Sequence, residues 1–565
     1  MKRKWVIKEI NEQVIPVMPE YPAVVLKLLA LRGITEEKAI QQFLEPDYNK
    51  LLDPFIFKDM GKTVERIWNA IDTKQTIAIY ADYDADAITA LAVMYQALKK
   101  AGATVDYYIP DRFTEGYGMN LDAIKKLKER NCSLIITVDC GINAVEEVNL
   151  ANELGMDVII TDHHELTGDL PKAYSIVNPK NPNDVYPFPY LTGVGVAYKV
   201  VQALFSNSEK RTEKGIQAGW EKWLLDLVAI GTVADCQSLT IENRILVAFG
   251  LKVLAKTRWP GLKALLDIAQ CKGNLDSYTL GFVLAPRINA AGRIKHADVA
   301  FRLLISENIV EAQNLAIELN ELNKHRQALT DQILSEAKAQ IEMISDRKVL
   351  LAYGQNWPKG VVGLVAGKLC EEYNRPVLIL DKAEDFATGS ARSNDSFDMV
   401  MALNDSKEYL LKYGGHKQAA GFTLESSKVD QFYKKLLAFA DSSGLEIAES
   451  NLYIDAELTD ADLNFQTLEF VEKLAPFGFG NFKPKFMSKN IELIDSAAVG
   501  PKSQHAKMRV RIGTVVFSAI AFNQAFLLNK IKPGQLFHAA YDLFVNEWNG
   551  LKQIDLKIID VKLDE

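Results

Sequence analysis

The sequence has few cysteines and no long apolar run. Its five cysteines lie far apart and form no Cys-x-x-Cys pair, which argues against a zinc knuckle or a disulfide framework and favours reduced thiols. No apolar stretch reaches the roughly 20 residues that span a bilayer. The opening residues, MKRKWVIKEI, carry no apolar core of signal-peptide length. We therefore expect a cytoplasmic protein with no membrane partner.

The chain also has no excess of basic residues. The chain has 65 Lys and Arg against 73 Asp and Glu, for a formal net charge of -8. This balance does not exclude a nucleic-acid partner, because clustered active-site carboxylates lower the sum and a single strand needs only a local basic groove. The length of 565 residues predicts about two to four domains.

Short β-rich runs alternate with helical segments in the first half of the chain. The expected strands are 76–80, 105–109, 134–138 and 157–160, and the helices between and after them are 90–100, 121–130 and 144–154. This order is typical of a parallel sheet with helices on its faces. Runs such as LIITV are apolar on both faces, as central parallel strands are.

The pattern of apolar residues changes twice in the second half of the chain. A mostly helical stretch ends in a long helix with Leu315, Leu319, Leu322, Leu329 and Ile333 at helical spacing. A second α/β unit begins with the strand KVLLAY, and alternating runs after Asn451 predict a small antiparallel barrel of the OB type. We expect an N-terminal segment (1–50), a parallel-sheet domain (51–305), a connecting long helix (306–345), a smaller α/β domain (346–445) and an OB-like β-barrel (446–565).

Acids and imidazoles follow three of the predicted strands. In an open parallel sheet, ligands gather outside the carboxyl ends of the strands. A further acid follows the apolar helical run LLDLVAIGTVAD. The residues at these places are Asp82, Asp84 and Asp86 of DYDAD, then Asp139, then Asp162, His163 and His164, and finally Asp235.

Oxygen and imidazole ligands without thiolates suit Mn²⁺ or Mg²⁺. Carboxylates can also bridge two cations about 3.5–4 Å apart, the arrangement that serves phosphoryl hydrolysis. A single Asp after a strand is more often a helix N-cap. Three such positions at one sheet edge, with an adjacent pair among only seven histidines, together favour a metal site.

The segments DYDAD, VDCGI, TDHHE and GTVAD resemble, in order and spacing, the four motifs of the DHH phosphoesterase family. A longer series is similar to the RecJ exonucleases within it, from roughly residue 75 to 422, and PFGFGNFKPKF in the last domain also fits. The series comprises YADYDADAITA, PDRFTEGYGMN, LTGVGVAYKV, APRINAAGR, GVVGLVAGKL, GSARS and YGGHKQAAGF.

The resemblance implies a DHH lobe, a smaller DHH-associated lobe and a cleft between them. It implies a single-stranded-DNA-specific 5′→3′ exonuclease of DNA repair and recombination, with a helicase and a single-strand-binding protein as expected partners. Two divalent cations, Mn²⁺ or Mg²⁺, would be held by Asp82, Asp84, Asp86, Asp139, His163, His164 and Asp235. Asp139 would bridge the cations and Asp162 would orient the histidines; which histidine ligates directly is left open.

The same resemblance assigns the substrate contacts. Arg112, Ser390 and Arg392 would hold a 5′-terminal phosphate, and arginine suits this because its fork pairs two phosphate oxygens. Arg287 and Asn289 would contact another phosphate. Tyr117 is either a base-stacking platform or a core tyrosine. Gly414, Gly415 and His416 are expected to form a glycine turn followed by a donor imidazole.

Two residues depart from the family pattern. Ala87 stands where the family has glycine, which matters if that position needs a positive φ, and Pro358 stands where many members have histidine. Neither is a metal ligand. Two alternatives are a phosphodiesterase of short oligoribonucleotides or cyclic dinucleotides, and a non-catalytic replication scaffold. Related hydrolases lack the barrel and the long helix, and a scaffold would have lost its acids.

Overall fold

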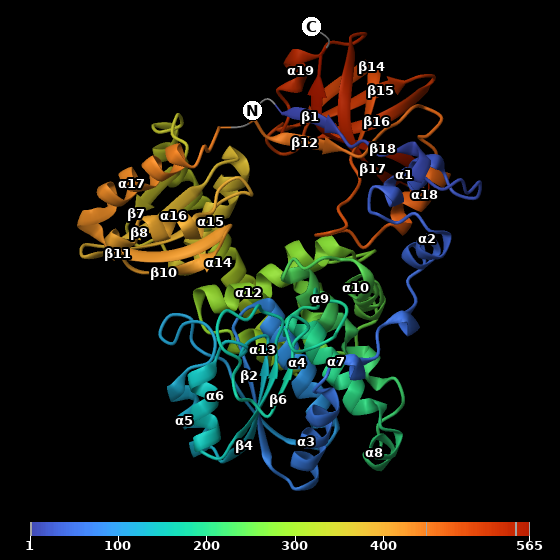
Figure 1. Ribbon diagram of the computed structural model, residues 1–565. Coiled ribbons are helices and arrows are strands. Elements are labelled where there is room, and N and C mark those ends of the chain that lie inside the picture. Colours follow the sequence, from blue (N-terminus) through green and yellow to red (C-terminus); the bar gives the residue numbers. More distant parts are fainter. Residues whose placement is uncertain (1–2, 448, 549–550, 564–565) are drawn as a thin grey trace. The chain divides into compact units, whose positions relative to one another are not determined.

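The computed structural model describes residues 3–447, 449–548 and 551–563. The chain forms two compact units (Figure 1). The large unit comprises Leu52–Gln237 and Phe249–Glu449, and the barrel unit comprises Met1–Leu51, Ser238–Ala248 and Ser450–Glu565. Within the described ranges, no helix combines the length and the apolar character that crossing a membrane requires.

A parallel sheet forms the first part of the large unit, as predicted. Its order is β3-β2-β4-β5-β6, and every pairing is parallel. The central strands are buried on both faces because their sequences, TIAIYA and CSLIITV, are mostly apolar. The strands are β2 (Thr76–Ala81), β3 (Thr104–Tyr108), β4 (Cys132–Val138), β5 (Asp157–Thr161) and β6 (Ser175–Val177).

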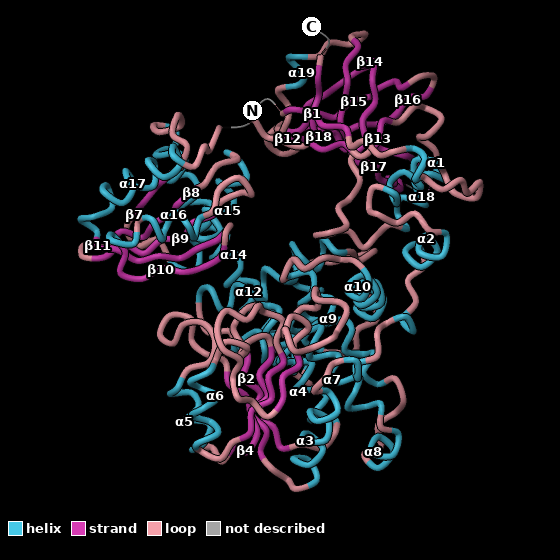
Figure 2. The backbone as a smooth tube through the Cα atoms, viewed as in Figure 1, coloured by secondary structure: helices cyan, strands magenta, loops and turns pink. Residues whose placement is uncertain are grey.

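Helices cover both faces of this sheet (Figures 1 and 2). On one face, Ile135 and Val158 of the sheet share a core with Ile124 of α5 and Val148 of α6. The elements α3, α4 and α7 lie on the other face. These helices are α3 (Met60–Asp72), α4 (Ala85–Lys100), α5 (Leu121–Glu129), α6 (Val145–Glu153) and α7 (Gly193–Ser206).

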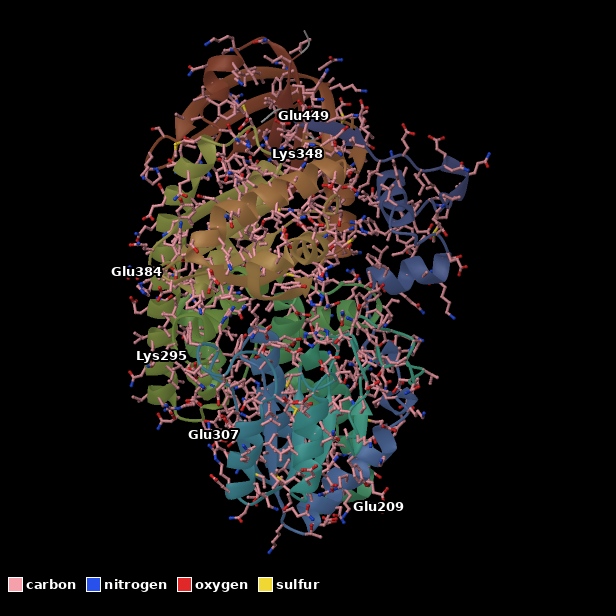
Figure 3. The ribbon with its side chains drawn as sticks, turned by 60° about the vertical axis from the view of Figure 1, so that its left-hand side comes forward. Glu209, Lys295, Glu307, Lys348, Glu384 and Glu449 are labelled. Carbon is pink, nitrogen blue, oxygen red and sulfur yellow. The ribbon has the colours of Figure 1, made fainter. Side chains whose placement is uncertain are left out.

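A helical stretch follows and ends in α14, which has 34 residues (Ile309–Glu342). Leu315, Leu319 and Ile333 are buried along it, so the predicted apolar spacing does face a core. Lys295 and Glu307, labelled in Figure 3, flank α13. The other helices are α8 (Ser208–Glu213), α9 (Leu225–Ala234), α10 (Ile241–Leu254), α11 (Pro260–Ile268), the π-helix η5 (Thr279–Leu284), α12 (Ala285–Ile294) and α13 (Asp298–Ile305).

The small lobe of the large unit has a mixed sheet of order β10-β11-β9-β8-β7. Only β7 and β8 pair in parallel; the other pairings are antiparallel. Helices pack against both faces of it, because two separate cores flank its strands. The elements are β7 (Leu350–Gly354), α15 (Lys359–Tyr373), β8 (Val377–Lys382), β9 (Phe386–Arg392), α16 (Met399–Asp405), β10 (Leu410–His416), β11 (Ala419–Glu425) and α17 (Val429–Ser442).

The glycine turn predicted at Gly414–His416 is wrong. These residues lie in the edge strand β10, where Gly414 pairs with Gly421 and Gly415 with Ala420. Gly415 has φ +147°, and a Cβ there would overlap the Ala419 carbonyl oxygen. The glycine therefore permits close strand approach rather than a reversal of the chain.

The barrel unit confirms the OB-like prediction. Its strands run in the order β14-β15-β16-β18-β17, and β14 also pairs with β17, which closes the barrel. One pairing, β16 with β18, is parallel, so the barrel is not wholly antiparallel. The elements are β12 (Asn451–Ile454), β13 (Ala456–Glu457), α18 (Phe465–Lys473), β14 (Phe486–Val499), β15 (His505–Ile512), β16 (Val515–Ala521), α19 (Leu527–Lys530), β17 (Leu536–Trp548) and β18 (Leu551–Lys562).

The N-terminal segment packs into the barrel unit. Val25, Leu29 and Ile40 share one core with barrel residues such as Phe486 and Leu556. The strand β1 (Lys4–Ile7) pairs in parallel with β12, and two helices follow it, α1 (Ala23–Ala30) and α2 (Glu37–Leu44). The short 3₁₀ helices of the chain are η1 (Glu12–Val14), η2 (Tyr48–Lys50), η3 (Pro54–Ile56), η4 (Trp220–Leu224), η6 (Lys407–Tyr409) and η7 (Ser426–Lys428).

Candidate metal centre

The carboxyl ends of β2, β4 and β5 bring acids around one imidazole. His163 Nε2 lies 3.0 Å from Asp139 Oδ1, 3.8 Å from Asp235 Oδ2 and 3.9 Å from Asp86 Oδ2. His163, Asp86 and Asp139 are each at most 3% exposed. Residues as far apart in the chain as Asp86 and Asp235 therefore meet at the sheet edge where parallel α/β proteins place their ligands.

Two short backbone contacts fix Asp86. Its carboxylate accepts hydrogen bonds from the backbone N–H groups of Gly193 (2.7 Å) and Val194 (2.9 Å), at the N-terminus of α7. A helix N-terminus favours negative charge there. A Cβ on Gly193 would collide with the Asp139 side chain, so only glycine lets these two acids approach the same helix.

Asp139 has a left-handed backbone, with φ +60°. Such a conformation costs free energy in a residue with a Cβ and is held only by a surrounding structure that fixes it. The Asp139 N–H donates to the Thr161 carbonyl oxygen at 3.0 Å, which continues the pairing of β4 with β5 by one residue. The sheet thus holds the carboxylate at its edge.

Asp162 orients the histidine pair. Its carboxylate accepts from the N–H groups of Ile142 (2.9 Å) and His163 (2.7 Å), and it lies 2.8 Å from Nδ1 of His164. The other ring nitrogen of His164, Nε2, lies 3.1 Å from the Tyr117 hydroxyl. The expected orienting contact of Asp162 is therefore present.

Burial and mutual repulsion destabilise the charges of the acids. Burial, followed by the neighbouring carboxylates, raises the pKa of Asp86 and of Asp139 well above the ordinary value. Burial and then Asp84 raise the pKa of Asp235 to about 6. Burial and the adjacent His164 lower the pKa of His163 to about 3, so this ring is neutral and can act as a ligand.

The donor set fits divalent cations. Among the described residues, Asp82 Oδ1, Asp139 Oδ1 and Asp235 Oδ2 are buried oxygens without a hydrogen bond; the short approach of Asp139 to His163 lacks hydrogen-bonding geometry. Two groups each have ligand atoms within 4.8 Å of one another: Asp139 with His163 and His164, and Asp86 with His163 and Asp235. Unpaired buried carboxylates that repel one another are stabilised by cations.

Asp82 and Asp84 are outside these two groups. Asp82 is 2% exposed, and its pKa is raised by burial and then by Asp84. Asp84 is the N-cap of α4, because its Oδ1 accepts the Ala87 N–H at 2.9 Å. Ala87 lies inside that helix, and its φ is not positive. The departure from glycine therefore leaves this loop unstrained.

Four arginines lie close enough to influence one another. Burial first, then Arg112 and Arg326, lower the pKa of Arg293 to about 10. Arg392, whose Nη1 donates to Ser390 Oγ at 2.9 Å, also has a lowered pKa, caused by burial and in part by Arg112. Arg112 stacks over the Tyr83 ring, 5.0 Å from its centre. The charges of these arginines repel one another, so a nearby anion would stabilise them.

The other residues that were predicted to contact substrate lie at several separate places in the structure. Asn289 Oδ1 accepts the Ala85 N–H at 2.9 Å and so braces the DYDAD loop. Arg287 donates to Val283 and Asn320. Tyr117 is 59% exposed, which contradicts the core alternative. Gly414, Gly415 and His416 are exposed, and within the described residues no hydrogen bond joins them to the acids; Pro358 precedes α15 as its N-cap.

The sequence favours a solvated or interlobe face of the long helix for Arg326, and it leaves Arg293 open between a phosphate contact and a structural ion pair. Arg293 Nη1 donates to the Gly360 carbonyl oxygen at 3.1 Å and thereby joins α12 to α15. Arg326 donates to Asn323 Oδ1 at 3.0 Å within α14. The available signal was the pair of arginines in APRINAAGR together with the Asn-Lys-His-Arg step of the long helix, but their convergence depends on tertiary structure.

The His164–Asp162 contact predicts a pH dependence of stability in metal-free protein. Burial opposes the charge on His164, but the hydrogen bond to Asp162 and the attraction of Asp162, Asp235 and Asp84 together outweigh it and raise the pKa from 6.5 to about 9. A raised folded-state pKa gives stabilisation that is complete below the unfolded value and is lost as pH rises through the folded one. In EDTA, the melting temperature should therefore fall between about pH 6.5 and 9.

His164→Gln should flatten this fall, whereas His325→Gln, at an exposed position on α14, should leave it unchanged. Thermal unfolding followed by circular dichroism at several pH values measures the slope. The same slope in the parent and in His164→Gln would contradict the assignment.

The comparisons with known proteins agree on one family. Residues 76–232 match the DHH family, N-terminal domain; residues 346–442 match the DHHA1 domain; and residues 454–560 match the RecJ OB domain. Single-stranded-DNA-specific exonuclease RecJ of Bacillus subtilis (strain 168) is 38% identical over 576 residues, which cover 100% of this chain and 71% of that protein.

Two crystal structures of RecJ from Thermus thermophilus are similar throughout. The complex with Mn²⁺ has a TM-score of 0.84 at 28% identity, and it covers 100% of this chain and 80% of that one. The complex with Mg²⁺ has a TM-score of 0.79 at 27% identity, with 100% and 79% covered. The three domain families match in order along the chain, and the whole of this chain aligns with a RecJ at 38% identity. The chain therefore belongs to the RecJ family.

Proposed function

We propose that this protein is a metal-dependent exonuclease that hydrolyses single-stranded DNA from its 5′ end, in DNA repair and recombination. The observation that carries the proposal is the convergence of Asp86, Asp139 and Asp235 on His163 Nε2, within 3.9 Å. The relatives are single-stranded-DNA-specific exonucleases, and two of their structures hold Mn²⁺ or Mg²⁺. Phosphodiester hydrolysis is the chemistry that such a centre serves.

The acids and histidines would hold two divalent cations, Mn²⁺ or Mg²⁺. The family resemblance assigns the bridging position to Asp139, which belongs to one candidate ligand group and lies 3.0 Å from His163, the residue common to both. Asp82 and Asp84 border the groups and complete the negative charge. A bound pair of cations would polarise the scissile phosphate and lower the pKa of the attacking water.

The chain's own residues prepare this site. Asp162 holds the imidazole of His164, so that its Nε2 and the Tyr117 hydroxyl face each other at 3.1 Å. Gly193 and Val194 hold Asp86 through backbone N–H groups, which favour the ionised carboxylate beside its neighbours. Asn289 keeps the DYDAD loop closed against α12. Such supporting contacts commonly change metal affinity by about 10–100-fold.

The arginine group would select the 5′ end. A terminal phosphate carries more charge than an internal diester, and Arg112 and Arg392 repel each other unless an anion lies between them. Ser390 offers a hydroxyl beside Arg392. Tyr117, exposed next to His164, is placed to stack on a base. We assign phosphate contacts to Arg287, Gly414, Gly415 and His416 with the family resemblance as their only support.

The alternative functions are not favoured. A hydrolase of very short substrates has no need of the closed barrel that matches the RecJ OB domain at residues 454–560. A scaffold has no need of buried, mutually repelling acids, which destabilise the fold without cations. We further propose a cytoplasmic location and a helicase and a single-strand-binding protein as partners, from the family resemblance alone.

Asp139→Asn tests the bridging role. Asparagine has the same size and tolerates the left-handed backbone at φ +60°, so the fold should survive; losing a carboxylate from a self-repelling group should even raise the melting temperature in EDTA. The kcat should fall by at least about 10³, the scale lost when a main electrostatic group is removed. The measurements are cleavage rate, strand affinity and melting temperature on one preparation.

Asp106→Asn is the matched control, because Asp106 lies on the same sheet and pairs with Arg130 away from the acids. Its kcat should equal the parent's. An Asp139→Asn protein that cleaves within about tenfold of the parent would refute the bridging role, and a collapsed one would make Asp139 a structural residue.

The arginine group predicts a preference for 5′-phosphorylated ends. The parent should degrade a 5′-phosphorylated strand faster than its 5′-hydroxyl twin. Arg392→Met should remove that preference and leave the 5′-hydroxyl rate nearly unchanged, because only the terminal phosphate loses its partner. End-labelled strands resolved on a denaturing gel give both rates.

Arg375→Met serves as the control, since Arg375 lies in the same lobe and donates to the carbonyl oxygens of Ser345 and Arg347. It should keep the preference. Equal parent rates on the two ends, or attack from the 3′ end, would remove the phosphate assignment.

A further inference from the structure

The loop that joins β3 to α5 carries two of the residues assigned to the substrate. Arg112 stacks over the Tyr83 ring, with 5.0 Å between the guanidinium carbon and the ring centre. Tyr117 follows later in the same loop, and its hydroxyl lies 3.1 Å from His164 Nε2. Both side chains therefore reach the region of the metal centre from one loop, so the position of this loop decides where they meet a strand.

Glu115 lies between these two residues and closes the first part of the loop on itself. Its Oε2 accepts the Asp111 N–H at 2.7 Å, and its own N–H donates to the Asp111 carbonyl oxygen at 2.8 Å. The Asp111 carboxylate in turn accepts the N–H of Thr114 at 2.9 Å and its hydroxyl at 3.1 Å. Residues 111–116 thus form one hydrogen-bonded turn that contains Arg112.

The same Glu115 carboxylate ties this turn to the sheet and to α5. Its Oε1 accepts the hydroxyl of Tyr108, the last residue of β3, at 2.6 Å and Nζ of Lys126, in α5, at 3.3 Å. Burial opposes the charge on Glu115, but the hydrogen bonds from Tyr108, Asp111 and Lys126 outweigh it and lower the pKa of the carboxyl group. Glu115 is therefore ionised at neutral pH, and hydrogen bonds to an ionised acceptor are the stronger ones.

The turn has little side-chain packing to hold it. Phe113 is 50% exposed, and Thr114 is exposed as well. A hollow of about 1270 Å³ borders the loop, and Tyr108, Thr114, Glu115 and Lys126 are among the residues that line it. Because exposed side chains contribute little packing, the position of the turn depends on the hydrogen bonds of Glu115.

The second part of the loop is held separately. The Tyr80 hydroxyl donates to the Gly118 carbonyl oxygen at 3.0 Å and accepts from Asn120 Nδ2 at 3.2 Å. The rings of Tyr80 and Tyr108 stack, with their centres 5.3 Å apart. The hydroxyls of two neighbouring rings therefore hold the two parts of the loop.

We propose that Glu115 is a positioning residue for the 5′-terminal phosphate: by tying the turn 111–116 to β3 and α5, it sets where Arg112 is presented. The inference rests on the proposed function, since it assumes that Arg112 holds this phosphate. Loss of Glu115 should displace Arg112 more than Tyr117, because a separate hydroxyl holds the second part of the loop. The preference for a phosphorylated end should then weaken while the rest of the strand is still bound.

Glu115→Ala tests this in the full chain, because alanine removes every contact of the carboxylate. Dissociation constants of short 5′-phosphorylated and 5′-hydroxyl strands are measured by fluorescence anisotropy in EDTA, which prevents metal-dependent cleavage. The affinity for the phosphorylated strand should fall by about tenfold, since a misplacement of about 1 Å can cost as much as 10²-fold. The affinity for the hydroxyl strand should stay nearly unchanged. An unchanged preference in Glu115→Ala would overturn the proposal.

Glu115→Gln is the conservative variant. Its side-chain oxygen can still accept the Asp111 N–H, and its amide nitrogen can face the Tyr108 hydroxyl, so the preference should be kept. A loss as large as that of Glu115→Ala would mean that the charge, rather than the hydrogen bonds, matters, and this would contradict a positioning role.

Tyr108→Phe and Tyr80→Phe form a matched pair, because each removes one hydroxyl from one of the two stacked rings. Tyr108→Phe should lose part of the preference, and it decides the question if Glu115→Ala does not fold. Tyr80→Phe should keep the preference, since its hydroxyl holds Gly118 and not the turn 111–116. An equal loss in both variants, or no loss in Tyr108→Phe, would overturn the proposal.

The parent chain separates this inference from the proposed function. If the parent binds both ends equally, the phosphate assignment itself fails, and the positioning role of Glu115 fails with it. If the parent prefers the phosphorylated end and Glu115→Ala does so to the same degree, the positioning role alone fails.

Discussion

Mutual repulsion among buried carboxylates is the constraint on which the structure of the metal centre depends. Asp86, Asp139 and Asp235 meet around a neutral His163, and Asp86, Asp139 and His163 are buried. Nothing in ordinary core packing favours such an arrangement, because each charge raises the pKa of the next. The surrounding fold tolerates it through fixed N–H donors, through the glycines that admit the acids, and through a strained backbone at Asp139.

Much of this arrangement was readable from the sequence because it follows from chain order. A strand such as LIITV ends in the residue that must lie at the sheet edge, so the strand pattern alone places Asp139 and the Asp162–His164 run there. The fold classes of the lobes and of the barrel follow from periodicity for the same reason.

Contacts between distant segments could not be read in this way. Gly414 and Gly415 look like a turn, because two adjacent glycines usually punctuate the chain, yet they lie in β10, where a neighbouring strand approaches too closely for a side chain at Gly415. Asn289 Oδ1 also accepts the Ala85 N–H, a contact that the local sequence does not indicate. The grouping of Arg293 and Arg326 with Arg112 depends on three different segments and has no local signal.

Two groups of opposite charge thus lie in the large unit: acids at the sheet edge that fit divalent cations, and the half-buried group of Arg112, Arg293, Arg326 and Arg392. The most direct test is a titration of metal-free parent protein with Mn²⁺, followed by electron paramagnetic resonance. Two ions per chain are expected, with the exchange-coupled spectrum of a pair about 3.5–4 Å apart. A single bound ion, or two ions with uncoupled spectra, would contradict the account.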